Sequence, residues 1–166
     1  MIRRPKPDTP RPGQESVWDY PRPPELERDD RLVEVRFGGT VVASTTGSYR
    51  VLETSHPPGY YLPPADVRVD LLVAEPGSSV CEWKGRAAYW SVRVGDAVAV
   101  NAGWSYPNPT PAFEAIAGFV SFYPGRVDEV KVGGEVVRPQ AGGFYGGWIL
   151  DEIVGPFKGE PGTWGW

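Results

Sequence analysis

The stretch that decides the fold is Arg31-Leu-Val-Glu-Val-Arg-Phe37, followed by Gly38-Gly39 and by Thr40-Val-Val-Ala-Ser44. Its apolar residues Val33, Val35 and Phe37 alternate with charged ones, which places them on one face of a β-strand. Two glycines between strand-like runs are typical of a type I′ turn, because both central residues of that turn need a positive φ. The stretch therefore predicts an antiparallel β-hairpin.

A related pattern returns 95 residues further along the chain, from position 31 to position 126. It reads Arg126-Val-Asp-Glu-Val-Lys-Val132, then Gly133-Gly134, then Glu135-Val136-Val137. Two explanations stay open: convergence on the same stable hairpin, or an old duplication that gives a pseudo-symmetric sheet. Neither glycine pair is followed by a helix start, so we do not interpret them as phosphate-binding loops.

The composition fits one globular domain built from short strands. The chain has 166 residues, of which 40% are hydrophobic and 23% charged, as in a folded domain. With 21 glycines and 19 prolines, long helices are disfavoured and strands joined by tight turns are favoured. The fold class that we predict is therefore all-β, with one short helix.

Charge and cysteine content argue against several classes of function. The net charge is −4, from 17 basic and 21 acidic residues, and lacks the basic excess expected of a nucleic-acid-binding domain. The single cysteine excludes an internal disulfide and favours a reducing, cytoplasmic location. We expect no secretory signal, because no basic n-region followed by an apolar h-region opens the sequence. We also expect no membrane span, because no apolar run approaches the roughly 20 residues that a span needs.

Several further segments have strand-like patterns: residues 49–54, 66–72, 87–94, 97–100 and 119–123. In residues 66–72, Val67, Val69 and Leu71 alternate with polar residues, which predicts a half-buried strand. Gly95-Asp96 predicts a second type of hairpin, and Pro76-Gly77-Ser78-Ser79 predicts a turn.

One helix is expected after Thr110. Thr110 suits the N-cap, Pro111 suits the first helical position, and Gly118 suits the position after the end. Between them, Phe113, Ile116 and Ala117 would form one apolar face.

The pattern along the chain predicts three parts. Residues 1–24 are rich in proline and form an extended arm, because proline removes amide donors and blocks helix. Trp18 and Tyr20 could fix the end of this arm, which is either a solvated tail or a partner-binding segment. Residues 25–140 form the core domain. Residues 141–166, rich in glycine and aromatics, form an ordered extension that wraps the core, since a free tail would expose its aromatic rings to water.

Several motifs resemble a bacterial family known only as domain of unknown function 427. The motifs are Leu52-Glu-Thr-Ser-His-Pro-Pro58, Tyr61-Leu-Pro63, Cys81-Glu-Trp-Lys-Gly85, Ala87-Ala-Tyr-Trp90, Ala102-Gly-Trp-Ser-Tyr-Pro107 and Phe119-Val-Ser-Phe-Tyr-Pro124. They keep the order and approximate spacing of the family over residues 30–140. The glycine- and aromatic-rich end resembles a longer, actinobacterial-type subgroup.

This resemblance implies a β-tent (Mss4-like) fold with two antiparallel sheets that meet at an angle. Several β-tent relatives carry a four-cysteine zinc site, which needs four Cys or His ligands. Cys81 and His56 supply two at most, so we expect no metal site and no cofactor. The family is sometimes labelled nucleotidyltransferase-like, which implies an enzymatic alternative.

The stretch Cys81-Glu-Trp-Lys-Gly-Arg-Ala-Ala-Tyr-Trp90 holds the strongest candidates for a site. Cys81 could be a nucleophile with His56, the only histidine, as its base, or it could be a small buried hydrophobe. Lys84 could contact an anionic ligand as a point charge, or its stem could pack on Trp83 at the surface.

The candidate ligand-binding residues are His56, Tyr60, Tyr61, Cys81, Trp83, Lys84, Tyr89, Trp104 and Tyr106. The aromatic residues among them could form a core, a ligand platform or both. Strand alternation places Tyr89 and Trp90 on opposite faces, so at most one of them faces a given pocket. Asp66 and Asp70 are the only acidic pair considered for magnesium, and a solvated strand face explains them better.

The function that we predict is binding of a small anionic or planar molecule in an aromatic-lined cleft. The alternatives are an enzyme, either nucleotidyltransferase-like or based on Cys81 and His56, and a structural domain that binds a partner through its proline-rich arm. Convergence of His56, Lys84, Trp104 and Tyr106 in one concave site would favour binding or catalysis, whereas scatter would favour the partner-binding domain. The sequence predicts no oligomeric state.

Overall fold

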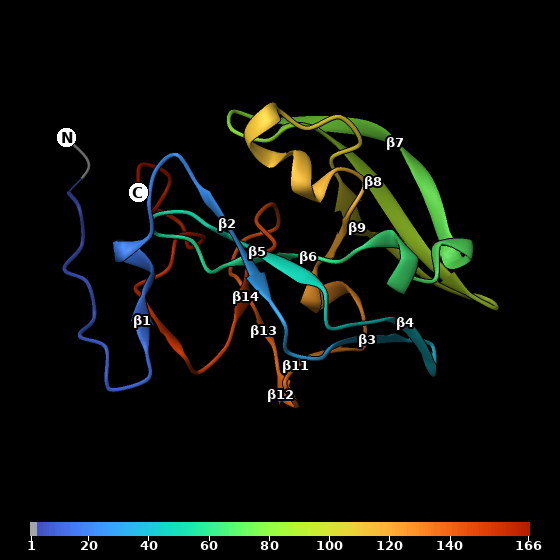
Figure 1. Ribbon diagram of the computed structural model, residues 1–166, viewed down its shortest axis with the longest axis horizontal. Coiled ribbons are helices and arrows are strands. Elements are labelled where there is room, and N and C mark those ends of the chain that lie inside the picture. The colour runs from blue at the N-terminus through green and yellow to red at the C-terminus, as the bar shows by residue number, and fades with distance from the viewer. Residues whose placement is uncertain (1–2) are drawn as a thin grey trace.

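The computed structural model describes residues 3–166, and β-strands form most of its regular structure (Figure 1). The strands are β1 (Glu15–Ser16), β2 (Glu25–Asp29), β3 (Val33–Phe37), β4 (Thr40–Thr45), β5 (Ser48–Leu52), β6 (Gly59–Tyr61), β7 (Leu72–Cys81), β8 (Gly85–Val94), β9 (Ala97–Ser105), β10 (Val120–Phe122), β11 (Glu129–Val132), β12 (Glu135–Val136), β13 (Arg138–Pro139), β14 (Trp148–Ile149) and β15 (Ile153–Val154). Short 3₁₀ helices accompany them: η1 (Val17–Asp19), η2 (Pro64–Asp66), η3 (Val69–Leu71), η4 (Pro111–Ile116) and η5 (Pro124–Arg126). The all-β prediction is confirmed.

Both predicted Gly-Gly hairpins form, and they lie side by side in one sheet. Gly38 and Gly39 have φ of 59° and 76°, and Gly133 and Gly134 have φ of 56° and 86°, as a type I′ turn requires. The strand order is β12-β11-β3-β4, so the first strands of the two hairpins pair with each other.

The register of that pairing makes the sheet pseudo-symmetric. Val35 pairs with Val130, its equivalent 95 positions later, and Val33 pairs with Val132, the equivalent of Phe37. The two copies of the repeat are therefore related by a local twofold axis at the Val35–Val130 pair. Both explanations of the repeat, duplication and convergence, are compatible with this arrangement.

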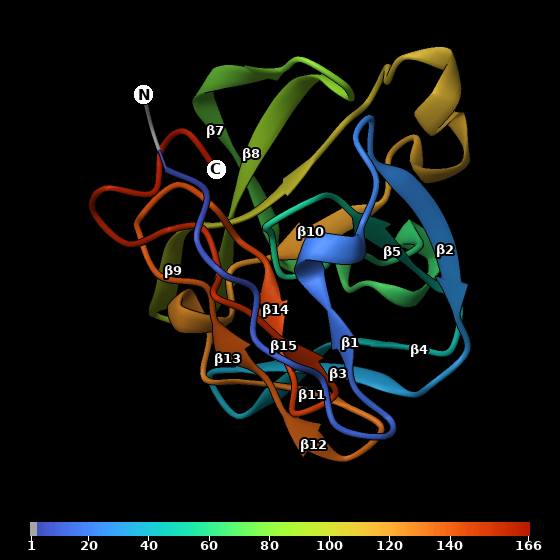
Figure 2. The same ribbon diagram turned by 90° about the vertical axis from the view of Figure 1, so that its left-hand side faces the viewer.

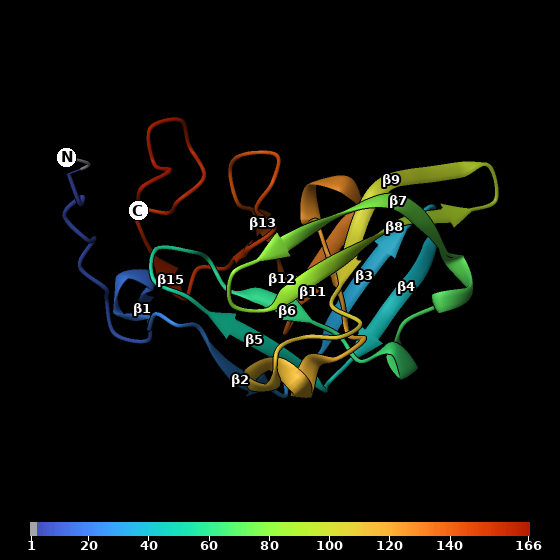
Figure 3. The same cartoon turned by 90° about the horizontal axis from the view of Figure 1, so that it is seen from above.

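A second four-stranded antiparallel sheet has the order β10-β9-β8-β7 and contains the predicted hairpin at Gly95-Asp96. It lies over the β3–β4 hairpin (Figures 1 and 3). A three-stranded sheet, β2-β5-β6, joins it through a single bridge between Leu62 and Val120. β10, whose three residues are all buried, confirms the buried strand expected in residues 119–123.

The main core lies between these sheets. Valines from β3, β4 and β11 meet Val92, Ala99 and Ala102 from the second sheet. Trp148 of β14 completes this core from the C-terminal part of the chain: it is fully buried, and its ring stacks on Tyr60 with a centroid distance of 4.7 Å. The apolar faces of strands far apart in sequence therefore share one interior.

The strand expected in residues 66–72 is absent, and that prediction was wrong. The segment instead forms η2 and η3, which enclose a single bridge between Val67 and Ala43. Pro63 and Pro64 precede it, and Pro64 at the start of η2 has the φ that a helical turn needs. Val69 is 53% exposed, so the apolar alternation does not correspond to one buried face.

Two other local predictions need correction. Pro76-Gly77 is not a turn between elements but a bulge inside β7, where the register shifts between Glu75 and Ser78. The expected helix is the 3₁₀ helix η4, which buries Phe113 and Ile116. Thr110 precedes it but does not cap it with its side chain; the hydroxyl donates to the Trp83 carbonyl oxygen at 2.6 Å.

The two ends of the chain lie side by side (Figure 2). β1 pairs in parallel with β15, and Trp18 donates its indole N–H to the Pro156 carbonyl oxygen at 2.9 Å. Val17, Trp18 and Tyr20 are buried, whereas most residues of the arm before Gln14 are exposed. Met1 and Ile2, the first residues of the predicted arm, lie outside the described residues. Within residues 3–166, no helix is long and apolar enough to cross a membrane.

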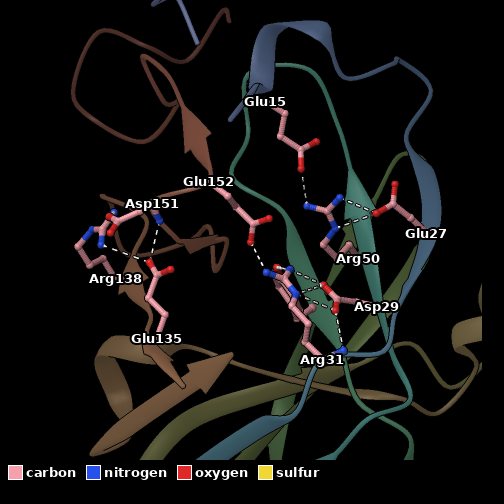
Figure 4. A network of polar contacts seen from close by, with 10 residues as sticks. Glu15, Glu27, Asp29, Arg31, Arg50, Glu135, Arg138, Asp151 and Glu152 are labelled. Atoms are coloured by element: carbon pink, nitrogen blue, oxygen red, sulfur yellow. Dashed lines mark hydrogen bonds and ion pairs between the residues drawn. The ribbon is translucent and has the colours of Figure 1, made fainter. Parts of the chain in front are cut away.

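Two arginines connect the N-terminal arm and the C-terminal extension to the neighbouring β2 and β5 strands (Figure 4). The buried Arg50 of β5 reaches Glu15 of β1 at 3.0 Å and also Glu27 of β2. Arg31 pairs with Asp29 and with Glu152, which precedes β15. Ion pairs to the buried guanidinium of Arg50 are less screened than surface pairs, so they help to hold the arm in place.

Candidate functional site

A cavity of about 170 Å³ opens between β5–β6, the second sheet and the loop of residues 140–147, and we call it the central cavity. It is lined by Val51, Glu53, His56, Pro57, Gly59, Tyr61, Ser79, Val80, Cys81, Lys84, Ala87, Tyr89, Trp104, Tyr106, Tyr123, Gln140, Phe144, Tyr145, Gly146 and Gly147. Aromatic rings, hydroxyl groups and a few charged groups therefore face the same small volume.

Seven of the nine candidate residues line this cavity: His56, Tyr61, Cys81, Lys84, Tyr89, Trp104 and Tyr106. Four of these, His56, Lys84, Trp104 and Tyr106, are the residues whose convergence discriminates between the functional hypotheses. They meet in one concave site, as binding or catalysis requires. The arrangement does not match the scattered distribution expected of a purely structural domain.

Tyr60 and Trp83 lie outside the cavity. Tyr60 is 1% exposed in the main core, where its hydroxyl accepts a hydrogen bond from Arg31 at 3.2 Å. Tyr61, the next residue of β6, points to the opposite side because adjacent strand residues alternate. Trp83 packs against a second group of buried side chains beside the cavity, which includes Phe113 and Ile116 of η4.

The same alternation separates Tyr89 from Trp90 on β8. Tyr89 lines the cavity, where its hydroxyl lies 2.7 Å from that of Ser79. Trp90 does not line it and instead donates its indole N–H to Ser105 at 3.0 Å. The prediction that only one of these two rings faces a given pocket is confirmed.

The aromatic wall is held rigidly by its own contacts. Trp104 donates its indole N–H to the Tyr61 hydroxyl at 3.1 Å, and the two rings meet edge to face. Trp104 also contacts Tyr123 with a centroid distance of 4.6 Å. Burial raises the pKa of Tyr61 and of Tyr106, so both phenols stay protonated and can donate hydrogen bonds.

Lys84 is the cation of the cavity. Its ammonium lies 5.6 Å from the centroid of the Tyr106 ring, within range of a cation–π contact. Burial alone would lower the pKa of Lys84, but Tyr61, Cys81 and Glu53 outweigh it and raise that pKa. Among residues 3–166, no carboxylate forms an ion pair with Lys84. The cavity thus contains a positive charge that is influenced by Glu53, a carboxylate of the same cavity, but that forms no ion pair with it.

His56 is neutral in the folded protein. Burial first, and then the positive charges of Lys158, Lys84 and Arg22, lower the pKa of His56 to about 3. Glu53 lies 3.4 Å from the imidazole Nε2, and the Tyr145 ring meets the imidazole edge to face. Glu53 is shared among three groups. Besides contacting His56, its carboxylate lies 3.7 Å from Arg22 and raises the pKa of Lys84.

Cys81 and His56 both line the cavity, but they have different polar partners. Cys81 is partly buried, and its proximity helps to raise the pKa of Lys84. His56 directs Nε2 at Glu53. Among residues 3–166, no group of three or more His, Cys, Asp or Glu side chains could hold a metal ion.

Several lining residues were not predicted from the sequence: Glu53, Tyr123, Gln140, Phe144, Tyr145 and their glycine neighbours. Glu53 and Tyr123 stand in motifs that carry the family resemblance, which was the available signal for them. The 140–147 loop had no such signal, because only tertiary structure brings it over β6 and β9.

The 140–147 loop is fixed over the cavity by hydrogen bonds. Gln140 closes its base, with its side-chain oxygen accepting from the Gly147 N–H at 3.0 Å and its amide donating to the Lys158 carbonyl oxygen at 2.6 Å. Nearer the tip, the Tyr123 hydroxyl donates to the Phe144 carbonyl oxygen at 2.8 Å. The loop is therefore an ordered wall of the cavity.

Replacement of Gly146 by alanine should displace this loop. A Cβ at position 146 would overlap the Trp104 ring and would lie 3.1 Å from Tyr123. Overpacking of this kind costs about 1–3 kcal/mol, and we expect that loss in the free energy of unfolding measured by chemical denaturation.

Gly143→Ala in the same loop is the matched control. A Cβ there has no neighbour within 4 Å, and its backbone is not left-handed. We expect a change below about 0.5 kcal/mol. Equal losses in both variants would contradict the close packing of Gly146 against Trp104.

Comparison with protein families matches residues 25–133 to the family described as "Domain of unknown function (DUF427)". No curated protein matches the chain. The matched segment runs from β2 to the second Gly-Gly turn and contains all seven predicted residues of the central cavity. Gln140, Phe144 and Tyr145 lie beyond it, so the cavity is completed by a part of the chain outside the match.

Proposed function

The chain belongs to the domain of unknown function (DUF427) family, and from this premise we propose that it is a binding module whose central cavity takes a small, planar anion. The observation that carries the proposal is the cation of Lys84, which lies among aromatic rings and forms no ion pair with a carboxylate of the described chain, although Glu53 lines the same cavity. An ammonium in such a place attracts an oxyanion as a point charge. The rings of Tyr61, Trp104 and Tyr106 provide apolar surface for a planar body.

The size of the cavity narrows the ligand class. An engineered cavity of about 150 Å³ binds benzene, so about 170 Å³ suits a single ring with a small anionic substituent. Monocyclic aromatic carboxylates have this shape and charge. A whole nucleotide would extend far outside a cavity of this size.

Nucleotidyl transfer is supported less well. That reaction calls for paired acids that hold magnesium near a phosphate site. Asp66 accepts a hydrogen bond from Thr45 at 2.7 Å, and Asp70 pairs with Arg68 at 2.8 Å; neither lines the central cavity. Catalysis by Cys81 with His56 as base has the further difficulty that burial lowers the pKa of His56 to about 3, which makes the imidazole a weak base at neutral pH.

We also propose the finer fold and setting that the resemblance and the sequence imply. The β-tent (Mss4-like) architecture is supported by two four-stranded antiparallel sheets that pack around one core. A bacterial origin follows from the resemblance, and a reducing cytoplasmic location from the single cysteine.

A thermal-shift screen tests the proposed function. The probes are benzoate, hydroxybenzoates and other monocyclic carboxylates, with the uncharged benzamide for comparison. A ligand at 100 times its Kd adds about 2.7 kcal/mol to the free energy of unfolding. At about 2–4 °C per kcal/mol for a chain of this size, we expect a rise in Tm of about 5–10 °C.

Lys84→Ala should abolish the shift, and Lys131→Ala is the matched control. Lys131 lies on β11, outside the cavity, and pairs with Glu129 at 3.5 Å. We expect the control to keep the full shift. If both variants lose the shift equally, or if no probe in the screen raises Tm in the wild type, the proposal fails and a partner-binding role takes its place.

A further inference from the structure

A second cavity, of about 320 Å³, lies between the two ends of the chain, and we infer that it binds a phosphate monoester. It is lined by Arg4, Trp18, Arg22, Thr54, Gly165 and Trp166. Only Thr54 belongs to the segment that matches the family. The site is therefore built by the arm and the C-terminal extension, and it goes beyond the function proposed for the central cavity.

Two guanidinium groups supply the charge of this second cavity. Arg4 forms no ion pair within residues 3–166; its guanidinium lies over the Trp18 ring, 4.9 Å from the centroid. Arg22 donates to the Thr54 carbonyl oxygen at 2.9 Å, and its carboxylate partner, Glu53, is 3.7 Å away. Guanidinium groups present several donors in a plane that matches phosphate oxygens.

The indole rings keep this charge in place. Trp18 is buried and fixed by its hydrogen bond to Pro156, and Trp166 meets it edge to face at 5.6 Å. Trp166 is only partly buried, so its ring offers apolar surface to an organic group. Lys158 donates to a backbone oxygen of Trp166 at 3.5 Å, but it does not line the cavity.

The chemistry of the site points to a phosphate monoester rather than to a carboxylate. A phosphate monoester carries a charge of about −2 at neutral pH and can accept from Arg4, which has no ion pair within residues 3–166, and from Arg22, whose ion pair with Glu53 is long at 3.7 Å. The cavity is nearly twice as large as the central one, so it leaves room for an organic group of nucleoside size beside the phosphate. An aromatic base in that space could stack on the exposed part of the Trp166 ring.

Isothermal titration calorimetry on the full chain tests this inference, with adenosine 5′-monophosphate as the probe. Inorganic phosphate and adenosine are the comparison ligands. We expect saturable binding of the monophosphate, weaker binding of inorganic phosphate, and none of adenosine. In Arg4→Ala, the Kd for the monophosphate should rise at least about tenfold, because one charge-assisted contact is lost.

Arg3→Ala is the matched control, since Arg3 is the adjacent arginine of the same exposed arm but does not line the cavity. It should change the Kd less than about twofold, as should Lys84→Ala, which tests whether the probe enters the central cavity instead. Three results would overturn the inference: an equal loss in Arg3→Ala and Arg4→Ala, a loss in Lys84→Ala, or no binding up to about 1 mM probe. Inorganic phosphate binding as tightly as the monophosphate would overturn the monoester class. None of these results touches the benzoate screen, so the two proposals can fail separately.

Discussion

Replacement of Trp148 by alanine is expected to lower the free energy of unfolding by about 3–5 kcal/mol. Trp148 is fully buried in the main core, where it stacks on Tyr60 at 4.7 Å. It also donates its indole N–H to the Phe122 carbonyl oxygen at 2.8 Å, and the alanine variant would leave that acceptor unpaired. At about 2–4 °C per kcal/mol, Tm should fall by about 6–20 °C.

Trp164→Ala is the control for this prediction. Trp164 lies in the same C-terminal extension but is 69% exposed, so its loss should change stability by less than about 0.5 kcal/mol. Chemical denaturation of both variants gives the comparison. A loss below about 1 kcal/mol in Trp148→Ala would show that the core of residues 25–140 is complete without the extension.

Acidification below pH 6.5 is expected to destabilise the protein through His56. The pKa of His56 falls from 6.5 to about 3 on folding, chiefly because of burial. The unfolded chain therefore binds a proton below pH 6.5 that the folded protein does not bind until about pH 3. The free energy of unfolding is therefore undiminished by His56 above pH 6.5. It falls as the pH decreases from 6.5 towards 3, at about 1.4 kcal/mol per pH unit.

The window between pH 6.5 and pH 5 isolates this effect, because carboxylates titrate mainly below it. His56 is the only histidine of the chain, so we expect the free energy of unfolding to fall by about 2 kcal/mol across the window. His56→Asn keeps a polar side chain without the titration and should remove the slope, whatever its effect on absolute stability. A wild type whose stability does not change over this range, or a variant with the same slope, would contradict the neutral, buried state of His56.

The strand pairs that depend on local chemistry could be predicted from the amino-acid sequence alone. Gly38-Gly39 and Gly133-Gly134 each need two left-handed residues in a row, which only glycine adopts at low cost, so the two hairpins could be predicted from a few adjacent residues. The alternation of side chains along β8 likewise predicted that Tyr89 and Trp90 lie on opposite faces of the strand. Both predictions rest on geometry within one or two strands.

Only the tertiary structure decided where those strands pack and which residues meet. Residues 66–71 have a strand-like pattern but pair with a neighbouring strand only through one bridge at Val67, which lies between the 3₁₀ turns η2 and η3, whereas Leu72 begins β7. Tyr60 and Tyr61 are the same residue type, yet one stacks on Trp148 in the core and the other lines the central cavity. Which of the two tyrosines is buried in the core and which lines the cavity depends on the segments that cover each face of the strand.

The central cavity shows most clearly which features the sequence predicts and which depend on tertiary structure. His56, Lys84 and Trp104 were identifiable from their own motifs, but the 140–147 loop that closes over them was not. Its position depends on hydrogen bonds with Gln140, Tyr123 and Arg126 and on the fit of Gly146 against Trp104. The contacts with Tyr123, Arg126 and Trp104 join residues far apart in sequence, and local propensity contains no information about them, because their energy exists only once the sheets have packed.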